Sequence, residues 1–199
     1  MSWLLSAFII IIFFVVYAVL HSWLAALAVK NWARGIFGPQ VDRWYRLVYN
    51  IIAVVTLLPL LLMLVWLPDM TLYVAPSPWR WLMVAGQVAA LGGLTVSLLQ
   101  TGLLHFLGLS QLVAGRPAES GVLSERGFYG WVRHPLYFFG TLLLWLTPLM
   151  TSNWLTVCVI FTLYFYLGSF LEERRLLAEF GPAYRAYQQR VSRFMPWKR

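Results

Sequence analysis

The chain has 199 residues, of which 61% are hydrophobic and 11% are charged, and its mean hydropathy is +0.72. This composition excludes an ordinary soluble globule and is typical of an integral membrane protein built as one domain over residues 1–199. The formal net charge of +8 would suit a nucleic-acid partner, but the basic residues lie in short segments between apolar runs. That distribution favours membrane lipids as the partner and predicts no binding of nucleic acid.

Five apolar runs predict an all-α, polytopic membrane protein with five transmembrane helices. Residues 1–104 hold three of them, which are long enough to cross a hydrocarbon layer of ~30 Å at ~1.5 Å per residue. Residues 105–199 hold a polar loop rich in glycine and proline, two further runs and a C-terminal tail. The short turn between the last two runs predicts a helical hairpin. The five runs cover residues 3–29, 45–67, 79–104, 136–150 and 154–171.

The basic residues predict the orientation. If the five runs alternate in direction, fourteen of the fifteen Lys and Arg residues fall on one face and Arg80 falls alone on the other. Cytoplasmic segments of membrane proteins carry this excess, so we expect the N-terminus outside and the C-terminus in the cytoplasm. The first run has no basic cluster before it and no small-residue exit, which predicts a retained helix. Cys158 is the single cysteine, which excludes an intramolecular disulfide and any metal site of several cysteines, and we expect no metal.

Two short polar motifs lie at the ends of the last two runs, and the hairpin should return both to the same membrane surface. The first is GFYGWVRHPLYFFG at 127–140, and the second is LEERR at 171–175. Pro135 suits the first position of a helix, so the helix start beside His134 should attract an anion. Glu172 and Glu173 offer negative charge at the facing end. Taken alone, these groups predict a pocket for a zwitterion such as an amino-acid derivative.

Each group also has an ordinary interpretation. Arg133 could be one of the basic residues of the cytoplasmic face, and His134 could be a helix cap at the membrane surface. The two glutamates could form a solvated helix end with the arginines that follow. The aromatic and basic tail at 180–197 could adhere to anionic lipid or close over a ligand. The appearance of complementary groups at both open ends of one hairpin favours a site.

The two motifs, with the continuation LLAEFGPAYRAYQQRVSRFMP, resemble the C-terminal signature of the isoprenylcysteine carboxyl methyltransferase and phospholipid methyltransferase superfamily. The resemblance covers about 111–196. It implies an integral membrane enzyme that uses S-adenosylmethionine as its cofactor on the cytoplasmic side and admits the methyl acceptor from the membrane. The segment at 106–111 and the pair His21-Ser22 resemble bacterial methanethiol S-methyltransferases, which belong to the same superfamily.

The resemblance also implies roles for individual residues. Apart from the resemblance, Arg133 is expected to be catalytic, because its positive charge would favour ionisation of an acceptor thiol. Glu172 is expected to meet the ammonium group of the cofactor, and the start of the helix at His134 to meet its carboxylate. The residues expected to bind the cofactor are Gln111, Gly121, Val122, Leu123, Ser124, Tyr129, His134, Pro135, Leu136, Tyr137 and Glu172.

The acceptor is predicted from one departure. The enzymes of the resembled family that methylate prenylcysteine share an arginine one helical turn before the cofactor glutamate. This chain has Gly168 at that position. An acceptor that needs no carboxylate clamp is therefore favoured, and we expect a small thiol or another lipophilic acceptor. Carboxyl methylation of a prenylated cysteine and N-methylation of a lipid amine remain alternatives. So does a non-catalytic membrane accessory protein.

Overall fold

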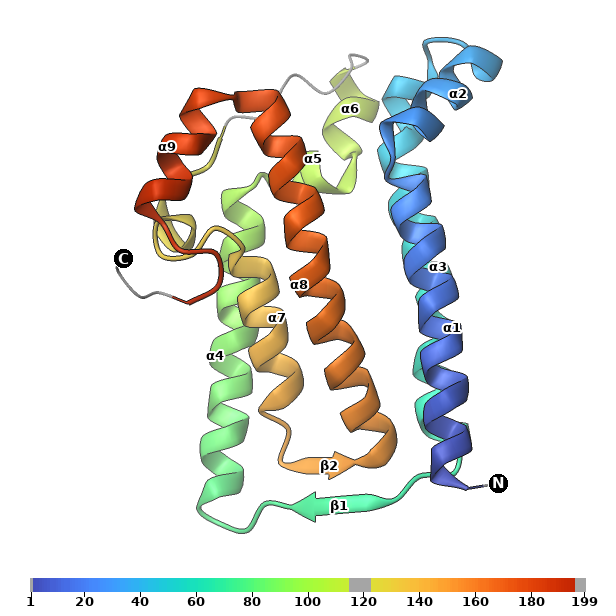
Figure 1. The fold of residues 1–199 in the computed structure, drawn as a ribbon, viewed down its shortest axis with the longest axis vertical. Coiled ribbons are helices and arrows are strands. Elements are labelled where there is room, and N and C mark those ends of the chain that lie inside the picture. The colour runs from blue at the N-terminus through green and yellow to red at the C-terminus, as the bar shows by residue number, and fades with distance from the viewer. Residues whose placement is uncertain (1, 115–122, 196–199) are drawn as a thin grey trace. The chain divides into compact units, whose positions relative to one another are not determined.

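The computed structural model describes residues 2–114 and 123–195, and these are predominantly helical (Figure 1). The chain divides into two compact units. The first takes in residues 1–70 and 102–121, and the second takes in residues 71–101 and 122–199. The single-domain interpretation stays a prediction, and the two units are described separately.

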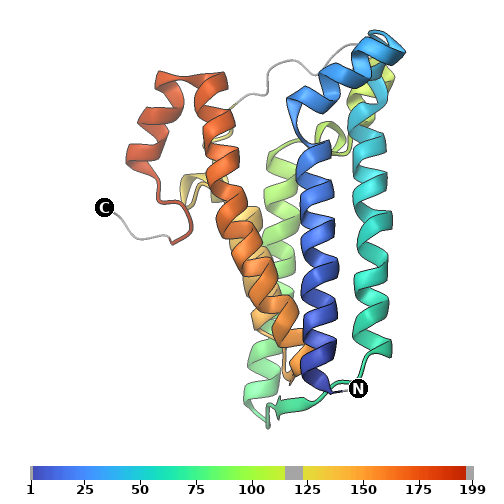
Figure 2. The same cartoon turned by 45° about the vertical axis from the view of Figure 1, so that its right-hand side comes forward.

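The first unit contains two long helices that lie side by side (Figure 2). Helix α1 spans Trp3–Leu24 and is capped by Ser2, whose hydroxyl accepts a hydrogen bond from the amide of Leu5. Helix α3 spans Val41–Trp66. Between them lies α2, Leu27–Phe37, which begins after a break at residues 25–26. The first predicted run at 3–29 therefore overran the true end of α1, because the apolar residues of α2 continue the same hydrophobic pattern.

Helix α2 is amphipathic and packs against the start of α3. Val29 and Ala33 are buried. On its polar side, Lys30 and Arg34 lie 2.9 Å and 3.5 Å from the carboxylate of Asp42, which is buried near the start of α3. The helix dipoles favour both charges, because Asp42 lies in the first turn of α3 and Arg34 lies in the last turn of α2.

Two short helices occupy part of the segment that the sequence indicated as a loop. These are α5, Leu103–Leu107, and α6, Leu109–Ala114. Their turn is tied to α3, since Arg46 donates to the carbonyl of His105 at 3.0 Å and Asn50 donates to that of Phe106 at 3.0 Å. Gly108 has a φ of 85°, and a Cβ there would lie 2.6 Å from the backbone nitrogen of Leu47. Only glycine fits both conditions.

The second unit is built on three helices with a small sheet at one end (Figure 1). The helices are α4 at Trp79–Gln100, α7 at Pro135–Trp145 and α8 at Ser152–Phe180. The sheet pairs β1, Thr71–Val74, antiparallel to β2, Leu149–Thr151, with Thr71 opposite Thr151. The sequence analysis did not predict these strands.

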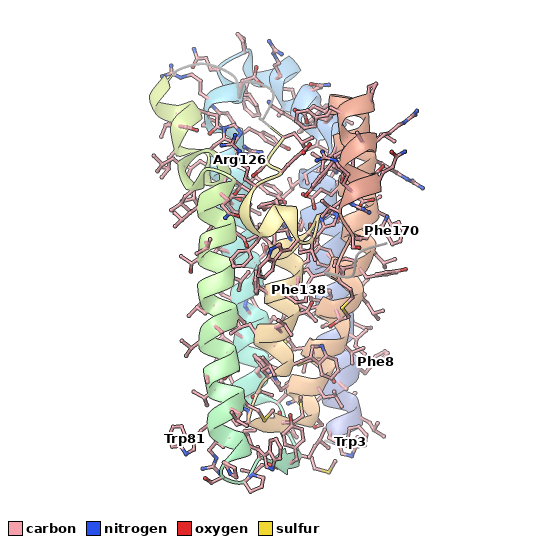
Figure 3. All side chains as sticks on the ribbon, turned by 90° about the vertical axis from the view of Figure 1, so that its left-hand side faces the viewer. Trp3, Phe8, Trp81, Arg126, Phe138 and Phe170 are labelled. Carbon is pink, nitrogen blue, oxygen red and sulfur yellow. The ribbon has the colours of Figure 1, made fainter. Side chains whose placement is uncertain are left out.

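The opposite end of the second unit carries the 3-10 helix η1, Gly127–Gly130, and helix α9, Pro182–Arg190. Figure 3 shows Trp81 near the sheet end of this unit and Arg126 near the other end.

Close packing joins α4 to α7. A Cβ at Gly86 would lie 2.8 Å from the side chain of Leu146, and one at Gly93 would lie 2.5 Å from the ring of Phe139. Small residues at these positions allow the two helix axes to approach closely in a membrane.

Among the described residues, four helices are long and apolar enough to cross a membrane, namely α1, α3, α4 and α8. The chain is therefore a multi-pass membrane protein by length and composition of its helices. Helix α7 has 11 residues and ends at Trp145. The last residues of the run predicted at 136–150 belong to β2 instead. Helix α8 is longer than predicted and carries the LEERR motif within it, beginning at Ser152 under the cap of Thr151. The count of five crossings stays a prediction.

Candidate functional site

The polar motifs meet at the end of the second unit where α7 begins. Helix α7 starts at Pro135, as the sequence predicts, and His134 precedes it with a non-helical backbone. The chain segment before α7 lies along the C-terminal segment. The amide of Arg133 donates to the carbonyl of Ser192 at 2.9 Å, and that of His134 donates to the carbonyl of Arg193 at 3.2 Å. Two main-chain bonds therefore fix the tail beside the helix start.

Glu173 is the centre of the ion-pair cluster. Its side chain is only 6% exposed. Its Oε1 accepts hydrogen bonds from Arg133 Nε at 2.9 Å, from His134 Nε2 at 3.1 Å and from Arg193 Nε at 3.1 Å. Its Oε2 accepts from Arg193 Nη2 at 2.8 Å and from Gln188 Nε2 at 3.0 Å. A buried carboxylate is stable only when its oxygens are paired in this way.

Arg133 is held on every side by protein acceptors. In addition to its contacts with Glu173, its Nη1 donates to the carbonyl oxygens of Gln188 and Val191. Because these bonds use each of its three nitrogens, Arg133 supplies a fixed positive charge.

Glu172 has a different environment from its neighbour. Its side chain is 46% exposed, and its Oε2 lies 3.2 Å from Nδ1 of His134. Successive residues of a helix point about 100° apart, so one glutamate faces the buried cluster and the other faces outward. Glu172 is therefore reachable by an incoming group.

The ring of His134 is buried between these two carboxylates. Nδ1 faces Glu172, and Nε2 faces Glu173. A neutral imidazole carries a single N–H, so its other nitrogen would direct a lone pair at a carboxylate. Burial opposes the charge of the ring, but the hydrogen bonds and negative charge of both glutamates outweigh burial and raise the pKa of His134 above its ordinary value. The geometry therefore favours the imidazolium.

Aromatic rings surround this imidazolium. The ring of Tyr137 stacks on it with centroids 5.4 Å apart and planes 5° apart, and Phe165 stacks on the other face of Tyr137 at 5.0 Å. Phe194, from the C-terminal segment, places its ring 5.7 Å from that of His134. The electron-rich face of an aromatic ring attracts a cation, so this arrangement suits a positively charged group.

Tyr129 joins the site from η1. Its carbonyl oxygen accepts a hydrogen bond of 2.6 Å from the hydroxyl of Tyr187 on α9. Burial, followed by the negative charge of Glu172, raises the pKa of the Tyr129 phenol above its ordinary range. The start of η1 is fixed to α4, since Gln100 Oε1 accepts from the amide of Phe128 at 3.3 Å. The tail, η1 and α7 thus share one end of the unit.

The structure brings seven of the predicted residues together. Arg133, His134, Pro135, Leu136 and Tyr137 lie at the start of α7, with Tyr129 and Glu172 beside it; of these seven, the first was expected to be catalytic. Leu123 and Ser124 are half-buried in the irregular segment before η1. Gly121 and Val122 lie outside the described residues.

Gln111 belongs to the first unit. It is buried, and its Nε2 lies 3.1 Å from Nδ1 of His105 and 3.3 Å from the carbonyl of the same residue. Burial and the charge of Arg46 lower the pKa of His105, which keeps this ring neutral and able to pair with an amide. The role of Gln111 in cofactor binding stays a prediction.

Sequence reasoning missed three members of the cluster as site residues: Glu173 was noted only for its charge, and Gln188 and Arg193 were not assigned to the site. The pair in LEERR held a usable signal, because successive residues of a helix point about 100° apart and so have different surroundings. Within the described part of the chain, no group of three or more His, Cys, Asp or Glu residues is placed to hold a metal ion.

Comparison with known proteins identifies the family. A family model described as "Protein of unknown function (DUF1295)" matches residues 2–191. The chain belongs to this family. Comparison with solved structures gives no match.

Several relatives carry the same descriptive name. The chain is 32% identical to a methanethiol S-methyltransferase of Mycobacterium tuberculosis over 192 residues, which cover 92% of this chain and 75% of the relative. It is 33% identical to methanethiol S-methyltransferase 2 of Bradyrhizobium diazoefficiens over 90% of this chain and 69% of the relative. It is 38% identical to methanethiol S-methyltransferase 1 of the same organism over 100 residues, which cover 48% of this chain and only 35% of that relative. These matches confirm the resemblance found in the sequence.

Proposed function

We propose that this DUF1295 protein is an integral membrane methyltransferase that transfers a methyl group from S-adenosylmethionine to a small thiol such as methanethiol. The observation that carries the proposal is the similarity of nearly the whole chain to proteins named methanethiol S-methyltransferase. The cluster at the start of α7 supplies groups of the right charge for such a cofactor.

The residues present fit the amino-acid end of the cofactor. Glu172 is an exposed carboxylate able to accept the ammonium group, and its position is fixed by His134. The first amides of a helix have no partner within it, so the start of α7 can receive a carboxylate. The face of Tyr129 can lie against the positively charged sulfur, a contact that contributes about 0.5–2 kcal/mol. The faces of Tyr137 already stack on His134 and Phe165, so Tyr137 would contact the cofactor by its edge or hydroxyl. When bound, the cofactor supplies an activated methyl group.

The chain's own contribution to the reaction is alignment, exclusion of water and control of charge. In-line transfer needs the acceptor, the methyl carbon and the leaving sulfur in a row, which a rigid and water-poor site provides. A thiol must ionise before it attacks, and nearby positive charge favours the thiolate. Arg133 is proposed to act here through its fixed charge, because its nitrogens already bond to protein acceptors.

Gly168 supports a small acceptor. It lies one turn before Glu172 on α8, and a Cβ at this position would be 3.9 Å from the hydroxyl of Tyr137. A Cβ would thus make only an ordinary contact with Tyr137 here, and no side chain fills the position at which the prenylcysteine enzymes share an arginine. An acceptor without a carboxylate would need no cation there.

The test is calorimetric titration of the purified protein in detergent with S-adenosylhomocysteine, followed by a methyl-transfer assay with methanethiol. We expect the wild type to bind. In Glu172→Ala the free energy of binding should weaken by about 1.5–3 kcal/mol, the contribution of a hydrogen bond to a charged group. Failure of the wild type to bind would contradict the proposal. Binding with turnover of a farnesylcysteine analogue, and none of methanethiol, would keep the cofactor and replace the acceptor.

A further inference from the structure

Glu173 has no role in the function proposed above, although it is the most extensively paired residue of the site. It lies between three cations, Arg133, His134 and Arg193, with its side chain 6% exposed. The residue expected to meet the cofactor, Glu172, does not touch the arginines in the described contacts and is bonded to His134. His134 is thus the link between the buried glutamate and the exposed one.

We propose that Glu173 is a positioning residue that keeps His134 in its imidazolium form, so that His134 Nδ1–H holds the Glu172 carboxylate ready for the ammonium group of the cofactor. The inference rests on the proposed function for the identity of the group that Glu172 receives. The charge relation between Glu173 and His134 rests on the geometry alone.

The two ring nitrogens of His134 face different carboxylates. Nε2 of His134 lies 3.1 Å from Glu173 Oε1, so a proton on Nε2 is stabilised by a carboxylate inside the protein. With that proton in place, Nδ1 can donate to Glu172 only if the ring carries a second proton. Without Glu173, a buried neutral ring could place its single proton on either nitrogen, and the bond to Glu172 would no longer be assured.

The other charged and titratable groups around His134 determine the sign of the effect. Glu172 and Glu173 on α8 favour the imidazolium, whereas Arg133 before the ring and Arg193 on the C-terminal segment oppose it. From its own helix, Tyr137 faces the ring as a stacked phenol. Removing an arginine should therefore raise the pKa of His134 or leave it unchanged, whereas removing the charge of Glu173 should lower it. That difference separates a charge role from a merely structural one.

The first experiment reads the protonation of His134 directly. The chain has three histidines, so a sample labelled with nitrogen-15 at histidine gives a simple spectrum, and His134→Gln assigns the signal. We expect both nitrogens of His134 to carry protons at neutral pH in the wild type. In Glu173→Gln the pKa of His134 should fall by about 1 unit or more, the usual effect of a nearby opposite charge.

Arg193→Gln is the matched control. It removes contacts of the same cluster and loosens the same C-terminal segment, but it leaves both carboxylates in place. In Arg193→Gln the pKa of His134 should stay the same or rise. Glu173→Asp, which keeps the charge, should restore a large part of what Glu173→Gln loses. If Glu173→Gln and Arg193→Gln shift the pKa of His134 in the same direction, Glu173 has only a structural role and the proposal is overturned.

The second experiment connects this charge to the cofactor. Affinity for S-adenosylhomocysteine should fall as pH rises through the pKa of His134, because Glu172 then loses its donor. Glu173→Gln should move this fall to lower pH and weaken binding several-fold at neutral pH. An unchanged pH profile in Glu173→Gln, with wild-type binding intact, overturns the inference and leaves the proposed function standing. Absence of binding by the wild type contradicts the proposed function, while the spectra still decide the charge relation.

Discussion

The hydroxyl of Tyr187 donates a hydrogen bond of 2.6 Å to the carbonyl oxygen of Tyr129. This contact joins α9 to η1, two elements that flank the polar cluster from different parts of the chain. The ring of Tyr187 is buried, with 2% of the residue exposed, so water cannot replace the lost partner easily.

Tyr187→Phe should therefore weaken the attachment of α9 to η1. We expect a loss of stability of about 0.5–1.5 kcal/mol, the usual contribution of one such bond, and weaker binding of S-adenosylhomocysteine. Tyr73→Phe is the control, since it removes a hydrogen bond of 3.0 Å to Thr147 at the sheet end of the same unit. Calorimetry should find unchanged affinity in the control. Equal affinity in both variants would show that the contact is not needed for the site.

Two adjacent glycines of α4 should respond differently to the same substitution. A Cβ at Gly93 would lie 2.5 Å from the ring of Phe139, whereas a Cβ at Gly92 would meet nothing within 4 Å. Gly93→Ala should destabilise the α4–α7 contact by about 1–3 kcal/mol through overpacking. Gly92→Ala should stabilise the helix by about 0.5–1 kcal/mol. Heating with a thiol-reactive dye can measure both, because Cys158 is buried and becomes reactive on unfolding.

His134 should make stability depend on pH. Its pKa is raised in the folded protein, so its stabilising contribution is complete below the ordinary histidine pKa of about 6.5 and is lost as pH rises through the folded-state pKa. Each unit of difference between the two pKa values contributes about 1.4 kcal/mol. Thermal unfolding should thus show a larger deficit of His134→Gln at about pH 6 than at about pH 9. A deficit that grows with rising pH would contradict the imidazolium.

Gly168 should influence the choice of acceptor. In Gly168→Arg, the new side chain begins 3.9 Å from the Tyr137 hydroxyl and can bring a cation into the site. We expect the ratio of turnover of a farnesylcysteine analogue to turnover of methanethiol to rise. Gly168→Ala is the matched control, because its added methyl makes an ordinary contact and brings no charge. The same ratio in both variants would show that Gly168 does not determine the choice of acceptor.

The number of membrane crossings can be measured with reporters at the two termini. Five crossings place them on opposite sides of the membrane, and four place them on the same side. The second unit favours five, because residues before α7 and after α8 meet at one end, as the pairing of Val132 with Ser192 requires. If α8 crosses the membrane, the segment at 135–151 must return across it. We expect a cytoplasmic signal after Arg199 and an external one before Ser2.

The sequence analysis predicted well where the chemistry itself determines local structure. Pro135 cannot continue a helix that precedes it but fits a first helical turn, so the start of α7 could be placed to the residue. It predicted less well where apolar composition was the only guide. The break after Leu24 lies inside a hydrophobic run whose composition does not change, and the exit from α7 after Trp145 is marked only by Thr147-Pro148 within its run.

The pairing within the site depended on tertiary structure. Glu172 and Glu173 are equivalent in composition, and only the packing of α8 against α7 and the C-terminal segment decides which one is buried. Arg193 could not be assigned for the same reason, since nothing local relates it to a glutamate on another helix.

The alignment of the C-terminal segment with residues 132–134 has a consequence for how the protein is made. A chain is synthesised from its N-terminus, so α8 can enter the membrane while Gln188 and Arg193 are still missing. Until those residues arrive, Glu173 has only Arg133 and His134 as partners. A newly inserted chain that stops short of Arg193 should therefore keep its membrane helices and lack a finished site.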